Sequence, residues 1–452
     1  MKNKLLIILL FIKSSFSFCQ CWTKISANGD FSIAIKVDGT LWAWGANNYG
    51  QLGDGTLMNK TTPNQIGSEA NWNMVSNGYF HTIALKSDGT IWAWGRNDFG
   101  QLGDGTTINK NLPIQIGNSN DWFKIFTGHN NSFAIKNDGT LWGWGFNGTG
   151  GLGDGTNINK TTPIQIDSSV WSYVSSSEIH TIALKSDGTL WAWGNNLYGQ
   201  LGDGSLINKN VPVQIGNSTN WSKIDTGMYH SVGIKNDGSY WAWGRNNFIY
   251  GDGNYQSQAS PTLIGNETWI NIYCGRQNVL GIKSDNSIWA WGDNGTGQLG
   301  NGNFINAQNP IKISDTNIWS DLSVGPHFSL ALKNDGSLWV WGYNGQYQYG
   351  NGTNVISNIP ISINCPNSLE LSESNYTKTI IYPNPSSNYI FIENDLNEIE
   401  QIDLFDIEGR KLVSKKVKNN LYKLDIDFLQ NSTYILKIQS INKTEIFKVQ
   451  KK

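Results

Sequence analysis

The chain carries a tryptophan pattern that repeats seven times. A Trp-x-Trp-Gly motif recurs every 48 to 50 residues, and a further Trp stands twenty residues before each pair. These triplets account for all 21 Trp residues of the 452-residue chain, and they begin at Trp22, Trp72, Trp122, Trp171, Trp221, Trp269 and Trp319. Such a period is typical of repeat architectures, in which each repeat is one supersecondary unit.

One repeat can be followed from Trp72 onward. Strands are expected over residues 72–76, 81–86, 91–95 and 112–116, with a hairpin turn at Ser87-Asp88-Gly89-Thr90. A glycine-rich loop separates the third strand from the fourth. Each repeat therefore predicts a blade of four antiparallel strands.

The predicted fold class is all-β. A single four-stranded blade cannot bury both of its faces, whereas seven blades stacked radially bury them against each other. We therefore predict a seven-bladed β-propeller over residues 22–365. A linear solenoid is the alternative, and the absence of atypical capping repeats disfavours it.

The N-terminus has the pattern of a signal peptide, expected over residues 1–19 with cleavage after Cys19. Lys2 and Lys4 precede an apolar run from Leu5 to Ile12, which is too short to cross a bilayer as a helix. We expect no transmembrane span in the mature chain, because no other apolar stretch approaches membrane length.

Export would place the remaining cysteines in an oxidising compartment, where disulfides can form. Cys21 precedes the first repeat and Cys365 follows the last, so a closed ring would bring them together. We predict a Cys21–Cys365 disulfide. The alternative is three unpaired thiols, with Cys274 as the third.

Three further patterns could suggest chemistry, but each has a structural explanation. His81, His180 and His230 share one position of the repeat that Phe fills elsewhere, which favours a half-buried histidine that caps backbone groups of its own blade. Asp54 stands alone between glycines, as turn residues do, and the loop 150–155 recurs without a following helix. We therefore expect no catalytic residue, no metal site and no cofactor. The net charge of −2 likewise disfavours nucleic acid as a partner.

The complete motif, seen best over residues 81–105, resembles the regulator of chromosome condensation repeat. It runs from His81 through Asp88-Gly89 and Trp92-Ala93-Trp94-Gly95 to Gln101-Leu102-Gly103-Asp104-Gly105. The resemblance covers residues 22–364 and implies a seven-bladed propeller. The family's namesake exchanges guanine nucleotide on a small nuclear GTPase, a role that an exported protein would not share. Exported bacterial relatives that bind other proteins are the closer precedent.

Residues 381–452, after a polar linker at 366–380, form a different unit. Three segments resemble the C-terminal sorting domain of the bacterial type IX secretion system: Tyr382-Pro383-Asn384-Pro385, residues 404–410 with Asp406 and Gly409, and residues 433–438 with Tyr434. The family usually has Gly where this chain has Ser432. The resemblance implies a small β-sandwich, contact with the secretion machinery, and export through the periplasm to the outer surface or beyond.

Comparison of the seven repeats separates positions that serve the fold from positions that are free for function. The Trp, Asp-Gly and Gly-x-Gly positions recur, whereas the two residues before the second strand vary, as does the residue five beyond the second Trp of each pair. The variable positions lie in the loops after the first and third strands. These loops emerge on one side of the ring, which we call the loop face. The opposite side, with the Asp-Gly turns, is the hairpin face.

The loop face is the predicted binding surface. Its candidate residues are Tyr49, Tyr79, Phe80, Arg96, Phe99, Tyr198, Met228, Tyr229, Phe248 and Arg276, with Arg245 nearby. Aromatic residues, Met and Arg are enriched at protein interfaces. The alternative for the four aromatic residues beyond the Trp pairs is that each packs within its own loop. In the fifth repeat this loop is one residue short, at Phe248-Ile249-Tyr250-Gly251.

These observations predict a secreted, monomeric recognition module for an unidentified extracellular protein or glycan, and not an enzyme. A polysaccharide-active enzyme is the first alternative. Its carboxylates would have to come from Asp30, Asp98, Glu178 and Asp293, which are scattered over different repeats. Guanine-nucleotide exchange is the second alternative.

Overall fold

The structure is a computed structural model of the chain. It describes residues 21–314, 319–366, 379–382, 384–394, 399–419, 421–440 and 443–452. The chain divides into two compact units, Met1–Pro366 and Asn367–Lys452, which we describe separately. The predicted signal peptide and most of the predicted linker lie outside the described residues.

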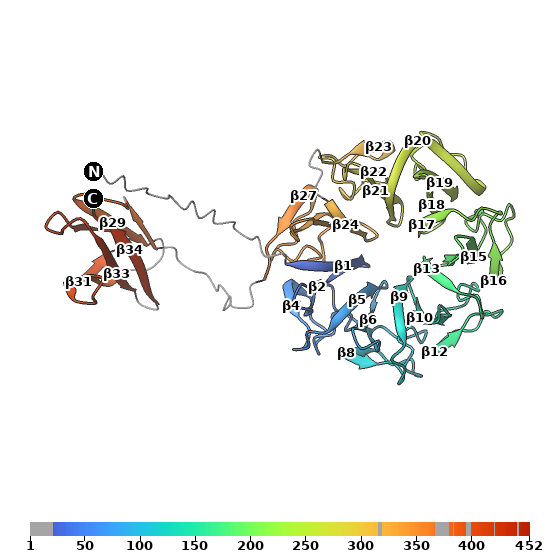
Figure 1. The fold of residues 1–452 in the computed structure, drawn as a ribbon, viewed down its shortest axis with the longest axis horizontal. Coiled ribbons are helices and arrows are strands. Elements are labelled where there is room, and N and C mark those ends of the chain that lie inside the picture. The colour runs from blue at the N-terminus through green and yellow to red at the C-terminus, as the bar shows by residue number, and fades with distance from the viewer. Residues whose placement is uncertain are drawn as a thin grey trace, which may run out of the picture. The chain divides into compact units, whose positions relative to one another are not determined.

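The first unit is a ring of seven blades, each with four antiparallel strands (Figure 1). Blades 1 to 3 comprise β1 (Trp22–Asn28), β2 (Phe31–Lys36), β3 (Leu41–Gly45), β4 (Lys60–Gln65), β5 (Trp72–Asn77), β6 (His81–Lys86), β7 (Ile91–Gly95), β8 (Lys110–Gln115), β9 (Trp122–Thr127), β10 (Asn131–Lys136), β11 (Leu141–Gly145) and β12 (Lys160–Gln165). Blades 4 to 7 comprise β13 (Trp171–Ser176), β14 (His180–Lys185), β15 (Leu190–Gly194), β16 (Lys209–Gln214), β17 (Trp221–Thr226), β18 (His230–Lys235), β19 (Ser239–Gly244), β20 (Gln258–Cys274), β21 (Asn278–Lys283), β22 (Ile288–Gly292), β23 (Ala307–Lys312), β24 (Trp319–Val324), β25 (Phe328–Lys333), β26 (Leu338–Gly342) and β27 (Ser357–Ile363). The all-β propeller predicted from the sequence is confirmed.

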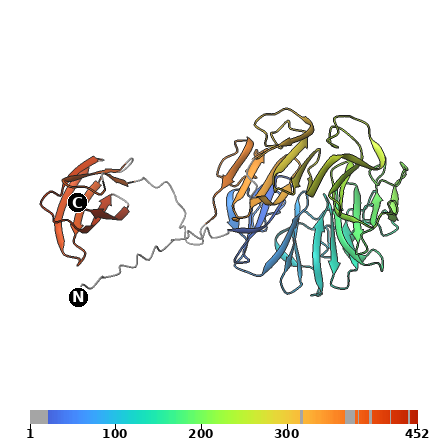
Figure 2. The same cartoon turned by 45° about the horizontal axis from the view of Figure 1, so that its top comes forward.

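The strands follow the predicted order from the centre of the ring outward, with three local differences. The first strand of blade 2 is Trp72–Asn77, one residue longer than the predicted 72–76. The fourth strand of blade 2 is Lys110–Gln115 rather than 112–116. β20 is one continuous strand that serves as the outermost strand of blade 5 and the innermost strand of blade 6, which joins the two blades into one sheet. Figure 2 shows the strands of neighbouring blades side by side around the ring.

Each innermost strand contains a β-bulge directly after its Trp. In blade 2 the pairing shifts between Trp72 and Met74, and the equivalent shift occurs in the other blades, for example between Trp22 and Lys24. The bulge breaks the simple alternation of side chains, so that Trp22 and Ile25 are both buried while the two residues between them are exposed.

Neighbouring blades are joined by hydrogen bonds to one carbonyl group. The indole Nε1 of Trp94 and the hydroxyl of Thr82, both in blade 2, donate to the carbonyl oxygen of Gln51 in blade 1, each at 2.9 Å. Gly103 must lack a side chain, because a Cβ there would lie 2.8 Å from Nε1 of Trp144 in the next blade. The recurring Trp, Gln and Gly residues of the motif therefore build the joints between blades.

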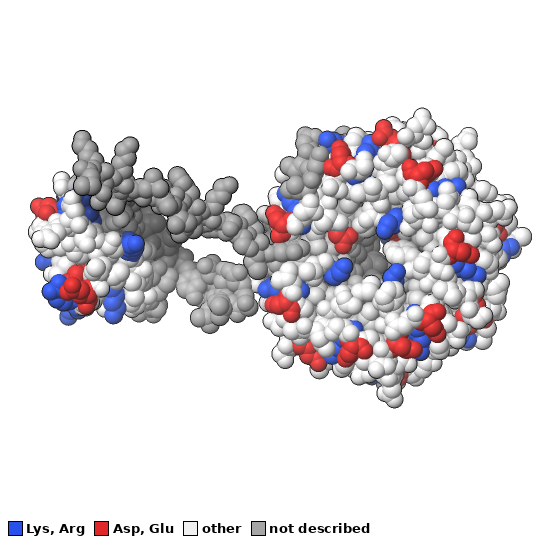
Figure 3. All heavy atoms as spheres, viewed as in Figure 1, with Lys and Arg blue, Asp and Glu red and all other residues white. Residues whose placement is uncertain are grey.

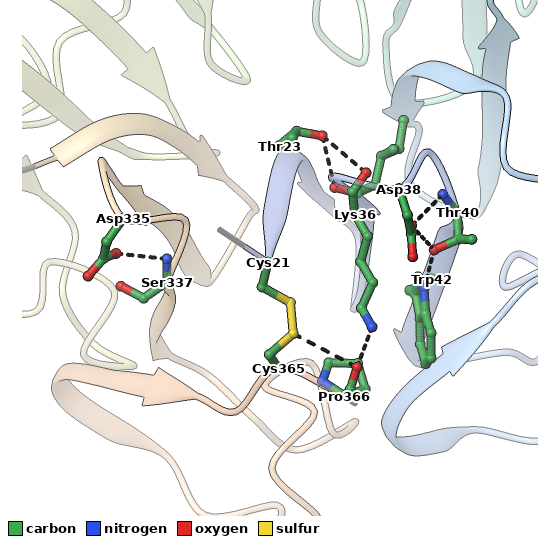
Figure 4. Close-up of a disulfide and its surroundings, with 11 residues drawn as sticks. Cys21, Thr23, Lys36, Asp38, Thr40, Trp42, Asp335, Ser337, Cys365 and Pro366 are labelled. Carbon is green, nitrogen blue, oxygen red and sulfur yellow. Dashed lines mark hydrogen bonds between the residues drawn. A yellow bond between two sulfur atoms is a disulfide. The ribbon is translucent and has the colours of Figure 1, made fainter. Parts of the chain in front are cut away.

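The ring closes through the same joint. Trp44 Nε1 and Ser32 Oγ of blade 1 both donate to the carbonyl oxygen of Gln348 in blade 7, each at 2.8 Å. A disulfide joins Cys21 to Cys365 across this seam, with 6.0 Å between their Cα atoms (Figure 4). Cys274 is buried and unpaired. Since each terminal blade is built from consecutive strands, no strand is exchanged at the seam.

The second unit consists of two small antiparallel sheets. Its strands are β28 (Thr379–Tyr382), β29 (Tyr389–Asn394), β30 (Ile399–Phe405), β31 (Lys411–Asn419), β32 (Leu421–Asp425), β33 (Thr433–Ser440) and β34 (Lys443–Gln450). The sheets have the orders β28-β29-β32 and β31-β30-β33-β34. Ile390, Ile402, Leu424 and Leu436 are buried in a separate apolar core. Among the described residues, no helix has the length and apolarity to cross a membrane.

Candidate functional site

Backbone contacts within each blade place the two variable loops next to each other. The N–H of Arg96, which follows the third strand of blade 2, donates to the carbonyl of Phe80 in the loop after the first strand, at 2.9 Å. The same bond joins Arg245 to Tyr229 and Ala46 to Asp30. Gly95 permits this approach, because a Cβ there would lie 2.5 Å from the Phe80 oxygen. The loop face is therefore one surface of the ring.

The first cluster of candidate residues lies where blades 1 and 2 meet. The ring of Tyr49 packs on Phe80 at 4.8 Å between centroids, and Phe80 packs edge-on against Tyr79 at 4.5 Å. The guanidinium of Arg96 lies 5.2 Å from the ring centre of Tyr49 and 5.7 Å from those of Phe80 and Phe99. Its Nε also binds Asp98 at 2.6 Å. These side chains are only half-buried, so they form an aromatic and cationic surface that solvent can reach.

The same arrangement occurs where blades 4 and 5 meet. Tyr198 and Tyr229 pack at 5.1 Å between ring centres, and the Arg245 guanidinium lies 5.2 Å and 5.7 Å from their respective ring centres. Tyr198 remains 40% exposed. Two blade junctions thus carry the same aromatic pair covered by an arginine, and we call these the aromatic–arginine clusters.

A funnel opens at the centre of the loop face, between the loops that follow the innermost strands. Its lining includes Tyr79, His129, Glu178, Met228, Arg276 and Pro326. Tyr79 and His129 stack at 3.9 Å, and Arg276 Nε donates to the Met228 sulfur at 3.1 Å. Burial, together with the positive charges of Arg276 and Arg96, lowers the pKa of His129 to about 4. The funnel is therefore bordered by a neutral imidazole, an exposed arginine and a thioether.

Below the funnel a polar channel runs between the innermost strands, with a volume of about 260 Å³. Side chains in its wall connect adjacent blades: Ser26 Oγ accepts from Asn77 N at 3.0 Å, and Asp225 accepts from Cys274 N at 2.7 Å and from Ser175 Oγ at 2.6 Å. Burial raises the pKa of Asp225. These polar groups hold the inner strands together.

The structure brings together most of the predicted surface residues, but not all. Phe248 packs at 4.2 Å on Tyr255 of its own loop and has no ring contact with either cluster. For Phe248 the alternative of packing within its own loop therefore applies. Tyr49, Phe99 and Tyr198 instead pack on residues of the following blade.

Two surface residues were not among the predicted candidates. His129 stacks on Tyr79, and the ring of Phe146 packs on Phe99 at 5.2 Å. Both occupy variable positions of the third repeat, equivalent to Tyr79 and Arg96. Comparison of the repeats at the position directly after Trp-x-Trp-Gly, which holds Arg96, Phe146 and Arg245, could have revealed Phe146.

Two models of one known repeat family match most of the ring. The model described as the regulator of chromosome condensation repeat matches residues 38–85, 88–135, 138–184, 187–234 and 285–332. A second model of the same repeat matches residues 22–51, 172–200, 269–298 and 319–348. This chain belongs to the regulator of chromosome condensation repeat family.

Solved structures of other proteins share the fold at low sequence identity. Human WBSCR16 is 19% identical with a TM-score of 0.64, over 70% of this chain and 87% of that protein. Yeast RCC1 (Prp20), solved bound to Kap60, is 18% identical with a TM-score of 0.64, over 81% and 92% of the two chains. Prp20p from Saccharomyces cerevisiae, studied for its binding to Gsp1p and histones, is 20% identical with a TM-score of 0.64, over 78% and 89%. This likeness establishes the fold alone.

The repeat propeller also carries an export tail. Residues 380–452 match the secretion system C-terminal sorting domain. This domain interacts with the type IX secretion machinery, and it directs the protein to the cell surface or the extracellular space. The chain is therefore a secreted propeller module.

The sorting-motif residues have structural roles in the tail. Asp406 and Gly409 form the turn between β30 and β31, where the Asp406 carboxylate accepts from the N–H groups of Glu408 and Arg410. The side chain of Asn384 hydrogen-bonds to β34: its Nδ2 donates to Lys448 O at 2.7 Å, and its Oδ1 accepts from Gln450 N at 2.9 Å. Tyr434 is buried, and its hydroxyl donates a hydrogen bond to Gln430 O at 2.9 Å. Tyr382 is exposed. Pro383 lies outside the described residues.

The histidines of the repeat motif differ from the prediction. His81, His180 and His230 are fully buried rather than half-buried. His81 Nε2 bonds Ser132 Oγ, and His180 Nε2 bonds Ser231 Oγ, both at 2.9 Å and both in the next blade. The reason is that this position lies in the contact between two blades rather than at a surface.

The lone aspartates also belong to the fold. Asp54 accepts from Thr56 N at 2.9 Å and pairs with Lys60 at 2.8 Å, which closes the loop between the third and fourth strands. Within the described parts of the chain, no group of three or more His, Cys, Asp or Glu residues is placed to hold a metal ion.

Proposed function

We propose that the loop face of this secreted propeller binds an extracellular macromolecule, a protein or a glycan, through the funnel and the two aromatic–arginine clusters. The observation that carries the proposal is the recurrence of an aromatic pair under an arginine at two separate blade junctions. Other joints of the same ring hold together without this arrangement, so the fold does not require it.

A protein ligand is the better match to the chemistry of the surface. Tyr, Met and Arg side chains supply large contact areas and are enriched at protein interfaces, and Tyr and Arg are among the residues that dominate binding energy there. Glu178 is the one carboxylate among the described residues that line the funnel. A polysaccharide-active enzyme is expected to use a pair of carboxylates, so the lining of the funnel does not support that alternative.

The test is a variant that removes the apolar surface and leaves the blade joints intact. Tyr79→Ala, Phe80→Ala, Met228→Ala and Tyr229→Ala combined should abolish ligand capture, measured on a glycan array and by cross-linking to proteins of the culture medium with identification by mass spectrometry. The class of ligand that the wild type retains and the variant loses decides between protein and glycan.

The control removes apolar surface from the hairpin face. Phe123 and Ile270 are exposed and lie in grooves beside the hairpin turns at Asp88 and Asp237. Phe123→Ala with Ile270→Ala should leave capture unchanged. Equal capture by the loop-face variant and the wild type would contradict the proposal.

A further inference from the structure

One variable position of the repeat lies at the hairpin-face end of the channel. It is the second residue after the Trp of each innermost strand, and it is occupied by Lys24, Met74, Lys124, Tyr173, Lys223, Asn271 and Asp321. In blades 1 and 5 the β-bulge after the Trp leaves the side chain at this position out of the apolar core, and Lys24 and Lys223 are exposed. Since the position differs between blades, the fold does not dictate its chemistry.

The channel lining and two hydrogen bonds show that residues at this repeat position lie at the channel. Tyr173 lines the channel wall together with Tyr273. The Tyr273 hydroxyl donates to the Asp321 carboxylate at 3.0 Å, and Asn271 Nδ2 donates to the Tyr273 oxygen at 2.8 Å. Burial raises the pKa of Asp321, while the positive charges of Lys24 and Lys223 oppose that shift. The carboxylate of blade 7 therefore lies within electrostatic reach of lysines from blades 1 and 5.

The charges at this level do not balance. Lys24, Lys124 and Lys223 come from alternate blades, and Asp321 is the one acidic residue at the equivalent positions. Lys124 Nζ donates to the carbonyl of Ser172 at 3.0 Å. In the part of the chain that the structure describes, Lys24 and Lys223 form no salt bridge. Figure 3 shows basic and acidic groups at the border of the central hollow.

We propose that Lys24, Lys124 and Lys223 form a binding site for a multivalent oxyanion at the hairpin-face mouth of the channel. Ammonium groups bind phosphate, sulfate and carboxylate oxygens through charge-assisted hydrogen bonds. Like charges held at one level by a rigid ring repel one another, and an anion with two or more charges relieves that repulsion. Tyr173 and Asn271 offer neutral hydrogen-bond donors at the same level. This site lies on the opposite side of the ring from the proposed loop-face site and does not depend on it.

The experiment is calorimetric titration of the purified full chain with inorganic phosphate and, separately, with citrate at low ionic strength. The two probes distinguish a compact oxyanion from a polycarboxylate. Lys24→Gln, Lys124→Gln and Lys223→Gln combined should weaken binding by about 100-fold, because all three charge-assisted contacts to the anion are lost. Added salt should weaken the wild-type binding.

Two further variants control for net charge and for shape. Lys415→Gln, Lys416→Gln and Lys418→Gln remove the same charge from exposed positions of β31 and should leave binding unchanged. Asp321→Asn keeps the shape of the channel while it removes the opposing charge, and should tighten binding several-fold. Failure of the wild type to bind either probe, or equal weakening by the β31 variant, would overturn the proposal.

Discussion

At the residue scale, the motif histidines show how one ring position can hold His, Asn or Phe. The side chain is enclosed between two blades, where Phe31 and Phe328 fill the space by packing and His81 adds a hydrogen bond to Ser132. Burial lowers the pKa of His81, His180 and His230 to about 3 from an ordinary value of 6.5. The folded ring therefore keeps these imidazoles neutral.

This burial predicts a loss of stability in mild acid. Below pH 6.5 the unfolded chain takes up protons on these histidines, whereas the folded ring does not. Their contribution to the free energy of unfolding is therefore fully present above pH 6.5 and is lost as the pH drops towards 3. Each histidine should cost about 2 kcal/mol at pH 5. His81→Phe should reduce the difference in urea midpoint between pH 7.5 and pH 5.

His81→Asn is the matched control, since Asn131 and Asn278 occupy the equivalent position. Both variants remove the titrating group, so both should lose less stability on acidification, whatever their stabilities at neutral pH. An unchanged pH dependence in both variants would show that His81 is not the group responsible.

At the scale of elements, the short loop of blade 5 is filled by a tyrosine. Tyr250 stands where most repeats have Leu, for example Leu52 in blade 1. Its hydroxyl donates to Gly244 O at 2.6 Å and accepts from Gln258 N at 3.1 Å. The buried phenol thus ties the third strand to the fourth, in a loop that lacks one residue.

Removal of this hydroxyl should destabilise the ring. Tyr250→Phe leaves the Gln258 N–H and the Gly244 carbonyl without this partner, which should lower the free energy of unfolding by about 1–3 kcal/mol. Guanidinium denaturation would measure the change. Tyr198→Phe serves as the control, because the Tyr198 side chain is 40% exposed and loss of its hydroxyl should change the free energy of unfolding little. Equal effects of the two substitutions would argue against a role for the Tyr250 hydroxyl.

The strands were predictable from the sequence because turn residues and β-branched runs are local signals. His81–Lys86 and Ile91–Gly95 have the predicted bounds. The bulge after Trp72 and the continuity of β20 were not predictable, because both depend on pairing with strands distant in the chain.

At the scale of the whole molecule, the seam joins the first blade to the last without an exchanged strand. Hydrogen bonds to Gln348 O connect these blades, and the Cys21–Cys365 disulfide joins residues that are 344 positions apart in the sequence. The Lys36 ammonium also bonds Pro366 O beside the disulfide and lies over the Trp42 ring, 4.4 Å from its centre (Figure 4). Covalent closure should restrict opening of the ring at this one junction.

Loss of the disulfide should lower stability without loss of the fold. Cys21→Ser with Cys365→Ser should reduce the free energy of unfolding by about 2–4 kcal/mol, since the cross-link limits the conformational freedom of the unfolded chain. Circular dichroism in guanidinium would measure the shift. A reductant should lower the wild-type midpoint and leave that of the double variant unchanged. A wild-type midpoint insensitive to reductant would contradict this role.

We expect the two units to have separate functions. Each has its own apolar core, so a chain that lacks residues 380–452 should keep the unfolding midpoint of the ring. The same chain should accumulate in the periplasm, whereas the full chain reaches the surface or the medium, as immunoblots of cell fractions would show. Arrival of the truncated chain outside the cell would show that the tail is not required.

The sequence by itself determined the number of blades, the order of strands, the sidedness of the loops and the sorting tail. These depend on motifs that recur at a fixed period or on local turn chemistry, which a single chain displays without knowledge of contacts. Only the tertiary structure decided which variable residues meet. Tyr49 reaches Phe80 and Arg96, whereas Phe248 remains in its own loop. The lysines of alternate blades share one end of the channel because ring closure and the bulge set side-chain direction, and both arise from contacts between residues far apart in the chain.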